Sequence, residues 1–247
     1  MRFFAGLIRP RVTVLGGEFA GVVEAVGEGV TAFTVGDRVF GFSEGRFGAA
    51  PSTEGSHYAL SYIRAAKIRS GQCVLVNGAT GAIGSAAVQL IKSLGASVTA
   101  VCAASHAELV RGLGADRVID NTAGDFTSDE QAYDVVFDAV GKSSFGRCKQ
   151  LLKPGGIYLS SDLGPLSQNP LLALITPLLG GKKVMFPVPP KHDQQGVRHF
   201  RDLIESGKFT PVIDRRYSLD QIVKAYRYVE TGQKIGNVVI NVDPARS

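Results

Sequence analysis

The sequence is short of the residues that build disulfide frameworks and metal sites. Its 247 residues include four histidines and three cysteines, Cys73, Cys102 and Cys148, and no tryptophan. The cysteines are odd in number and widely spaced, which argues against a set of disulfides and gives no metal-ligand spacing. Unpaired cysteines are typical of a reducing compartment, so we expect a cytoplasmic protein without a bound metal.

Long hydrophobic runs and charge clusters are also absent. No apolar stretch approaches the roughly 18 residues of a membrane-spanning helix, and the start of the chain lacks the pattern of a signal peptide. Lys and Arg outnumber Asp and Glu by 27 to 22 but are scattered, so we expect no nucleic-acid or membrane partner. A phosphate-rich cofactor would explain the mild basic excess equally well.

What the chain does contain is a glycine-rich turn between an apolar strand and a helix. The run Cys73–Val76 predicts a buried strand, and a helical pattern starts at Gly84. The turn resembles the Gly-x-Gly-x-x-Gly fingerprint of dinucleotide-binding proteins, with alanine at the first glycine position. Seven residues are therefore predicted to hold a pyrophosphate: Gly78, Ala79, Thr80, Gly81, Ala82, Ile83 and Gly84. The alternative is an ordinary strand-to-helix turn.

Strands and helices alternate from residue 72 to about residue 190. Further strands are predicted at 98–101, 117–119, 134–139, 157–160 and 183–188. Helices are predicted at 84–94, 107–113 and 148–152, with a turn at 154–156. This alternation is typical of a doubly wound parallel sheet.

The two ends of the chain have a different pattern. Residues 1–47 are rich in strands and turns and predict a small barrel. Residues 52–67 predict a helix that buries Tyr62. The tail predicts helices at 197–206 and 220–231 and a strand at 238–242.

Taken in order, several of these stretches resemble a known family. Val14–Val23, Val35–Val39, the glycine-rich turn, Phe137–Gly141 and Ile235–Val239 resemble the medium-chain dehydrogenase/reductase superfamily, in its zinc-free quinone oxidoreductase (zeta-crystallin-like) branch. The resemblance covers essentially the whole chain. It implies an α/β fold with hydride transfer from a nicotinamide cofactor to a quinone or an activated, conjugated carbonyl compound.

The resemblance also implies two domains. Residues 61–206 would form the Rossmann nucleotide-binding domain, and residues 1–60 with 207–247 an incomplete GroES-like catalytic domain. Gly17 stands where zinc-dependent relatives carry a histidine, so a zinc alcohol dehydrogenase is a distant alternative.

Compared with this family, the barrel part of the chain is short. The chain starts late, and a second gap is expected near Phe47–Ala50, so we expect a partial barrel. A shortened barrel would affect the substrate cleft more than the nucleotide site. The second hypothesis is therefore a non-catalytic, nucleotide-binding member of the family with an eroded substrate domain.

The second strand bears on the choice between NAD and NADP. NAD-preferring domains place a carboxylate at its end, but Val98–His106 contains no Asp or Glu. Ser105 and His106, with Arg111 nearby, offer donors for a 2′-phosphate, so we expect NADP(H). The alternative is that Ser105 only caps the next helix and that His106 is solvated.

Further cofactor contacts are expected where the strands end, because ligands of such sheets bind at the carboxyl ends. Six residues are predicted there, partly by resemblance: Cys102, Asn121, Ala139, Val140, Ser160 and Ser161. No catalytic residue is assigned. Tyr58 is expected to be a core or cleft-wall residue, and His57, His192 and His199 are expected at the surface. The apolar segment 183–188 is expected to be an edge strand that pairs with a second copy in a homodimer.

Overall fold

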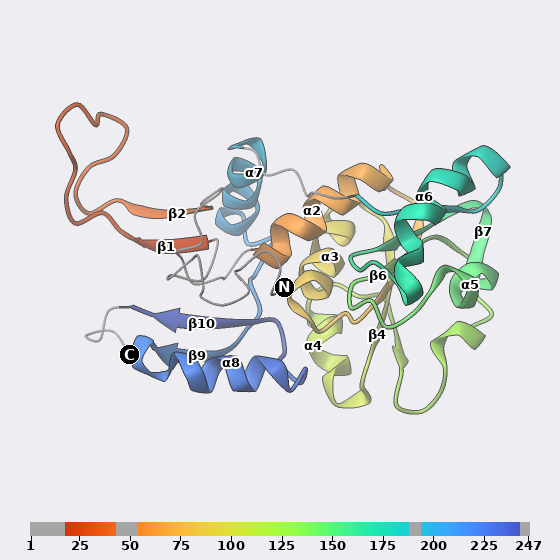
Figure 1. The fold of residues 1–247 in the computed structure, drawn as a ribbon. Helices are drawn as coiled ribbons and strands as arrows, with labels where there is room; N and C mark the ends of the chain where they lie inside the picture. The colour runs from red at the N-terminus through yellow and green to blue at the C-terminus, as the bar shows by residue number, and fades with distance from the viewer. Residues whose placement is uncertain (1–17, 43–53, 188–193, 243–247) are drawn as a thin grey trace. The chain divides into compact units, whose positions relative to one another are not determined.

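The computed structural model describes residues 18–42, 54–187 and 194–242 (Figure 1). Two compact units divide the chain: Met1–Glu54, Ile213–Gln233 and Asn237–Ser247 form the first, and Gly55–Val212 and Lys234–Gly236 the second. The sequence-based boundaries differ from this division by six residues at each main crossing, 60 against 54 and 206 against 212. The first part of the expected barrel, residues 1–17, and the expected gap near residues 47–50 lie outside the described residues.

A six-stranded parallel sheet with strand order β5-β4-β3-β6-β7-β8 forms the centre of the larger unit. Its strands are β3 Cys73–Asn77, β4 Ser97–Cys102, β5 Arg117–Asp120, β6 Tyr133–Asp138, β7 Leu152–Ser160 and β8 Lys183–Met185. The chain moves outward from β3 to β5, returns to β6 beside β3, and moves outward again to β8. This is the Rossmann order, and it makes the boundary between β3 and β6 the switch point of the sheet.

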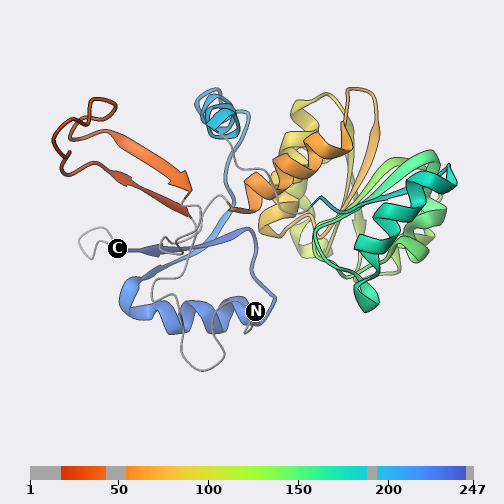
Figure 2. The same cartoon turned by 45° about the horizontal axis from the view of Figure 1, so that its top comes forward.

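Helices cover both faces of this sheet (Figure 2). They are α2 Glu54–Ala66, α3 Ala82–Ser93, α4 Ala107–Gly112, α5 Phe145–Cys148, α6 Gln168–Leu179 and α7 Gln194–Glu205. Val74 and Val76 pack with α2 and α3 on one face, whereas Leu75 packs with α5 and α6 on the other. The side chains of Val74, Leu75 and Val76 are all fully buried, as expected for a parallel strand covered on both sides. The prediction of a doubly wound α/β fold is confirmed.

Short 3₁₀ helices complete the larger unit. They are η1 Ala104–His106, η2 Phe126–Ser128, η3 Lys149–Leu151 and η4 Pro165–Ser167. The turn expected at residues 154–156 lies instead inside β7, whose pairing with β6 has a register shift between Tyr133 and Val135. Gly155 has a φ of 75°, so the strand accommodates the irregularity at a residue without a side chain.

A buried glutamine on α3 ties the sheet region to the segment after α7. The Gln89 Nε2 atom donates to the Thr210 carbonyl oxygen at 3.0 Å, and the Thr210 N–H donates to Gln89 Oε1 at 2.7 Å. We expect Gln89→Leu to lower the free energy of unfolding by about 1–2 kcal/mol, because both backbone groups lose their partner. Denaturant unfolding would measure this loss. Gln233→Leu, at an exposed position, is the control and should change little.

Two separate two-stranded sheets are seen in the described part of the smaller unit. Strands β1 Glu18–Val22 and β2 Arg38–Phe42 form an antiparallel hairpin. Strands β9 Ile213–Ser218 and β10 Asn237–Asn241 are parallel, with η5 Leu219–Gln221 and helix α8 Ile222–Glu230 between them. Tyr217, Ala225 and Val238 form the small core of this second group.

None of the helices in the described ranges is long and apolar enough to cross a membrane.

Candidate functional site

The glycine-rich turn links the end of β3 to the start of α3. Gly78 has a φ of 76°, a conformation that favours glycine, and a Cβ there would collide with the side chain of Val140. A Cβ on Gly84 would collide with the Gly78 carbonyl oxygen, so α3 can approach the turn closely only with glycine at this position. A Cβ on Gly81 would meet only the Gly78 carbonyl oxygen, at 3.5 Å, so the turn is open on this side.

Helix α3 begins without an internal cap. Its N-cap residue, Gly81, is extended, makes no side-chain capping hydrogen bond, and is followed by a first turn with no acidic residue. Ala82 and Ile83, in that turn, are half-buried. Because the first N–H groups of a helix have no intrahelical partner and carry the positive end of the dipole, this arrangement fits an anionic pyrophosphate.

Other groups of the turn are used inside the protein. The Ala79 N–H donates to the Val101 carbonyl at 3.1 Å, and the Gly81 N–H donates to the Gly78 carbonyl at 3.1 Å. The Thr80 carbonyl accepts the Gly236 N–H at 2.7 Å. These bonds hold the turn in shape and leave its outer side to a ligand.

At the end of β4, Ser105 and His106 lie in η1. Ser105 is exposed, His106 is half-buried, and the Ser105 Oγ lies 3.3 Å from His106 Nδ1. Arg111, the third expected phosphate donor, forms an ion pair with Glu108 at 2.6 Å. Arg111 must therefore give up or share this pair in order to bind a 2′-phosphate.

Asp120 also belongs to this neighbourhood and was not found from the sequence. It ends β5 opposite Cys102, and its Oδ1 accepts the Ala104 N–H at 3.1 Å and the Thr122 hydroxyl at 2.7 Å. Hydrogen bonds from Thr122 hold the pKa of Asp120 below its usual value. An ionised carboxylate therefore lies beside the loop expected to hold the 2′-phosphate. The signal that could have revealed it was the end of the third strand, which is a neighbour of the second in a Rossmann sheet.

Cys102 and Asn121 lie at the same edge. Cys102 is buried, and burial, with a smaller effect of the Asp120 charge, raises the pKa of its thiol. This suits a packing residue in the core. Asn121 is exposed, and its N–H donates to the Cys102 carbonyl at 3.1 Å.

The ends of β6 and β7 place the remaining predicted residues together. The Ala139 N–H donates to the Asn77 carbonyl at 3.1 Å, and Val140, 40% exposed, lies against Gly78. The Ser161 N–H donates to the Asp138 carbonyl at 3.2 Å. These residues therefore lie at the carboxyl ends of neighbouring strands, at the switch point.

Ser160 is placed differently from its neighbour. It is fully buried, and its Oγ accepts the Asp162 N–H at 3.2 Å. Its hydroxyl shapes the loop after β7, so its predicted cofactor contact would have to be indirect.

The helix before the turn corrects one expectation. His57 was expected at the surface, but it is only 4% exposed and packs edge-on against the Phe200 ring at 5.0 Å. His57 belongs to the buried face of α2, and this face includes more residues than the sequence pattern predicted. His199 is half-buried, and His192 lies outside the described residues.

Tyr62 is buried as predicted, and burial raises its pKa to about 12. Tyr58 is half-buried against the main core. Over the described ranges, no group of three or more His, Cys, Asp or Glu side chains is placed to hold a metal ion.

Fold and turn together define a Rossmann-type dinucleotide-binding domain. The sequence also matches the family model for zinc-binding dehydrogenases over residues 113–240, and the model for the alcohol dehydrogenase GroES-like domain over residues 2–110. The chain belongs to the medium-chain dehydrogenase/reductase superfamily.

Two curated relatives and one solved structure illustrate the similarity. The chain is 32% identical to 2-methylene-furan-3-one reductase of Solanum lycopersicum, over 95% of this chain and 65% of the relative. It is 33% identical to NAD(P)H oxidoreductase RTN4IP1, mitochondrial, of Mus musculus, over 70% of this chain and 48% of the relative. The chain thus spans between about half and two thirds of these relatives.

The solved structure is the quinone oxidoreductase from Coxiella burnetii. It matches with a TM-score of 0.77 at 22% identity, covering 93% of this chain and 79% of its own. At this identity the likeness shows the same fold.

Proposed function

We propose that this chain is an NADPH-dependent, zinc-independent oxidoreductase that transfers hydride to a quinone or a conjugated carbonyl compound. The observation that carries the proposal is the uncapped start of α3 behind an open glycine turn, at the switch point of the sheet. Membership of the superfamily and the name of the tomato relative support the reaction class. The nicotinamide cofactor would supply the hydride.

The chain's own residues would bind and orient. Residues 78–84 would hold the pyrophosphate through backbone N–H groups at the start of α3. Ala139, Val140 and Ser161 would orient the nicotinamide end from the carboxyl ends of β6 and β7. Ser105 and His106 would face the 2′-phosphate.

The first experiment titrates NADPH and NADH by fluorescence and then adds phenanthrenequinone, with absorbance followed at the nicotinamide band. Tight NADPH binding with turnover is the expected result. Binding without turnover of quinones or conjugated carbonyl compounds would favour the non-catalytic member of the family. If neither nucleotide binds, the proposed site is wrong.

Asp120 gives a sharper test of the NADPH preference. Its charge opposes a 2′-phosphate, which NADH lacks, so Asp120→Asn should raise the affinity for NADPH relative to NADH by about threefold. Glu130→Gln is the matched control, because it removes the same charge before the amino end of β6. An unchanged ratio of NADPH to NADH affinity in Asp120→Asn would mean that the 2′-phosphate does not bind near this loop.

We also propose that the chain forms a homodimer. Among the described residues, β8 pairs only with β7 and is therefore an edge strand of the sheet. The Val184 N–H of β8 donates to the Thr176 hydroxyl of α6 at 2.9 Å, so α6 packs against this strand. Helix α6, which contacts β8, carries Leu171, Leu174 and Leu178 on one face, and they are 59%, 73% and 85% exposed.

The size of this apolar surface fits a second copy of the chain. Three further apolar side chains are exposed nearby: Ile175 and Leu179 on α6, and Leu166 in η4, which precedes it. Together the six side chains expose on the order of 700 Å², close to the roughly 800 Å² per partner of a standard interface.

For its location we propose the cytoplasm. All three cysteines are free, which supports a reducing compartment.

A further inference from the structure

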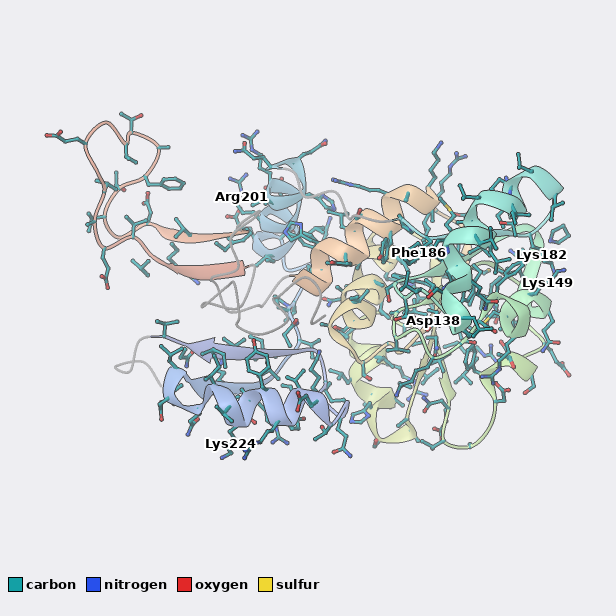
Figure 3. All side chains as sticks on the ribbon, in the orientation of Figure 1. Asp138, Lys149, Lys182, Phe186, Arg201 and Lys224 are labelled. Atoms are coloured by element: carbon teal, nitrogen blue, oxygen red, sulfur yellow. The ribbon has the colours of Figure 1, made fainter. Side chains whose placement is uncertain are left out.

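A buried carboxylate lies at the switch point of the sheet and has no role in the site described above. Asp138 is the last residue of β6, is fully buried, and pairs in register with Asn77, the last residue of β3 (Figure 3). Five groups donate hydrogen bonds to it: Asn77 Nδ2 at 3.0 Å, the Val140 N–H at 3.4 Å, the Gly141 N–H at 3.1 Å, the Ser143 N–H at 2.9 Å and the Tyr158 hydroxyl at 3.0 Å.

This set of partners suits an ionised carboxylate. All five donors are neutral, and four of them are amide N–H groups that cannot accept a carboxyl proton. Burial and the Asp138 charge raise the pKa of Tyr158, so its hydroxyl keeps its proton and donates. The result is a buried negative charge without a cation among these five partners.

The position of this charge is what requires an explanation. Ligands of a Rossmann sheet bind at the carboxyl ends of the strands, at the switch point. A negative charge there works against phosphate groups, which the start of α3 is arranged to hold. It would favour a positively charged ligand group instead. In a nicotinamide cofactor the oxidised ring carries such a charge, and the reduced ring is neutral.

We propose that Asp138 is a positioning residue whose buried charge makes the site favour the oxidised cofactor over the reduced one. This inference rests on the proposed function. When the reduced cofactor gives a hydride, one proton with two electrons, to the acceptor, its ring gains one positive charge. Asp138 therefore favours hydride donation while its hydrogen bonds hold the loop 139–143 against the glycine turn.

The test is the ratio of the dissociation constants for NADP⁺ and NADPH, measured by titration of the wild type and of Asp138→Asn. The variant should weaken NADP⁺ binding relative to NADPH binding on the order of tenfold, because it removes a buried unit charge. The ratio is the right readout because contacts shared by both forms, and any unfolded fraction, cancel in it. A merely structural Asp138 would weaken both forms equally.

Tyr158→Phe is the matched control, since it removes one donor and keeps the charge. It should leave the ratio unchanged. An unchanged ratio in Asp138→Asn, with both nucleotides still bound, would overturn the inference but not the proposed function. If the wild type binds neither nucleotide, both fall.

A measurement on the wild type covers the case in which Asp138→Asn does not fold. With ¹³C-labelled aspartate carboxyl groups, the Asp138 signal should show an ionised carboxylate at pH 7 and should shift more with NADP⁺ than with NADPH. A protonated Asp138 carboxyl, or equal shifts with the two forms, would contradict the proposal.

Discussion

Replacing Gly84 with valine is expected to abolish tight NADPH binding. A Cβ at this position would collide with the Gly78 carbonyl oxygen, which belongs to the backbone and cannot turn aside. Helix α3 would have to move away from the turn that its N–H groups complete. We expect at least about a hundredfold weaker binding, with a loss of about 2–3 kcal/mol in the free energy of unfolding. Nucleotide titration and denaturant unfolding would measure the two effects.

Substitutions at two other glycines distinguish an effect on the shape of the turn from an effect on its contact with the ligand. Gly81→Ala should fold normally, because its Cβ has room within the protein, yet it should weaken nucleotide binding by crowding the open side of the turn. Gly112→Ala, in α4 with no atom near its Cβ, should leave binding unchanged and stabilise by about 0.5–1 kcal/mol. Normal binding by Gly84→Val would show that the turn does not hold the nucleotide.

The double substitution of Leu174 and Leu178 by glutamate is expected to convert a dimer into a monomer. Both side chains are exposed on α6, so the chain itself should fold as before. In a symmetric dimer the change would place four carboxylates in an apolar interface, where each unpaired charge is costly. We expect the dimer dissociation constant to rise more than a hundredfold, measured by light scattering at micromolar concentration.

Leu94→Glu is the control for this experiment. Leu94 is 42% exposed and lies at the end of α3, which follows β3 rather than the edge strand β8, so the variant should remain dimeric. A monomeric wild type at micromolar concentration would rule out the proposed interface.

The elements that could be predicted have local signals. The β3 strand is a short β-branched run that ends in glycines, and α3 has a regular apolar face, so both were found within two residues of their bounds. The unpredicted α6 has no such signal. Its apolar residues are continuous rather than periodic, and Pro170 and Pro177 argue against a helix.

Strand β9 escaped prediction for another reason. Ile213–Ser218 contains three charged residues, and its strand conformation depends on parallel pairing with β10, some twenty residues further along. Such pairing leaves no local signal in the sequence.

The site residues also differ in whether a local sequence signal predicts them. The residues of the glycine turn follow one another in sequence, and the structure places them at one turn as expected, although their contact with a nucleotide stays a prediction. Asp120 and Asp138 matter because of their neighbours on other strands, Cys102 and Asn77. Which residues of two strands lie opposite each other is set by the pairing register, and the sequence alone does not specify it.

The way in which the chain is divided between its two units determines the order in which parts of the fold can form during synthesis. Residues 55–212 are continuous, so all six strands of the parallel sheet are synthesised before α8. In the smaller unit, the pairing of β9 with β10 needs residues 213–241, so it can form only after the sheet has been synthesised. Gly236, whose N–H bonds to the Thr80 carbonyl, is also made late. A nascent chain could therefore form its sheet first and complete the bonds of its glycine-rich turn only once Gly236 has been made.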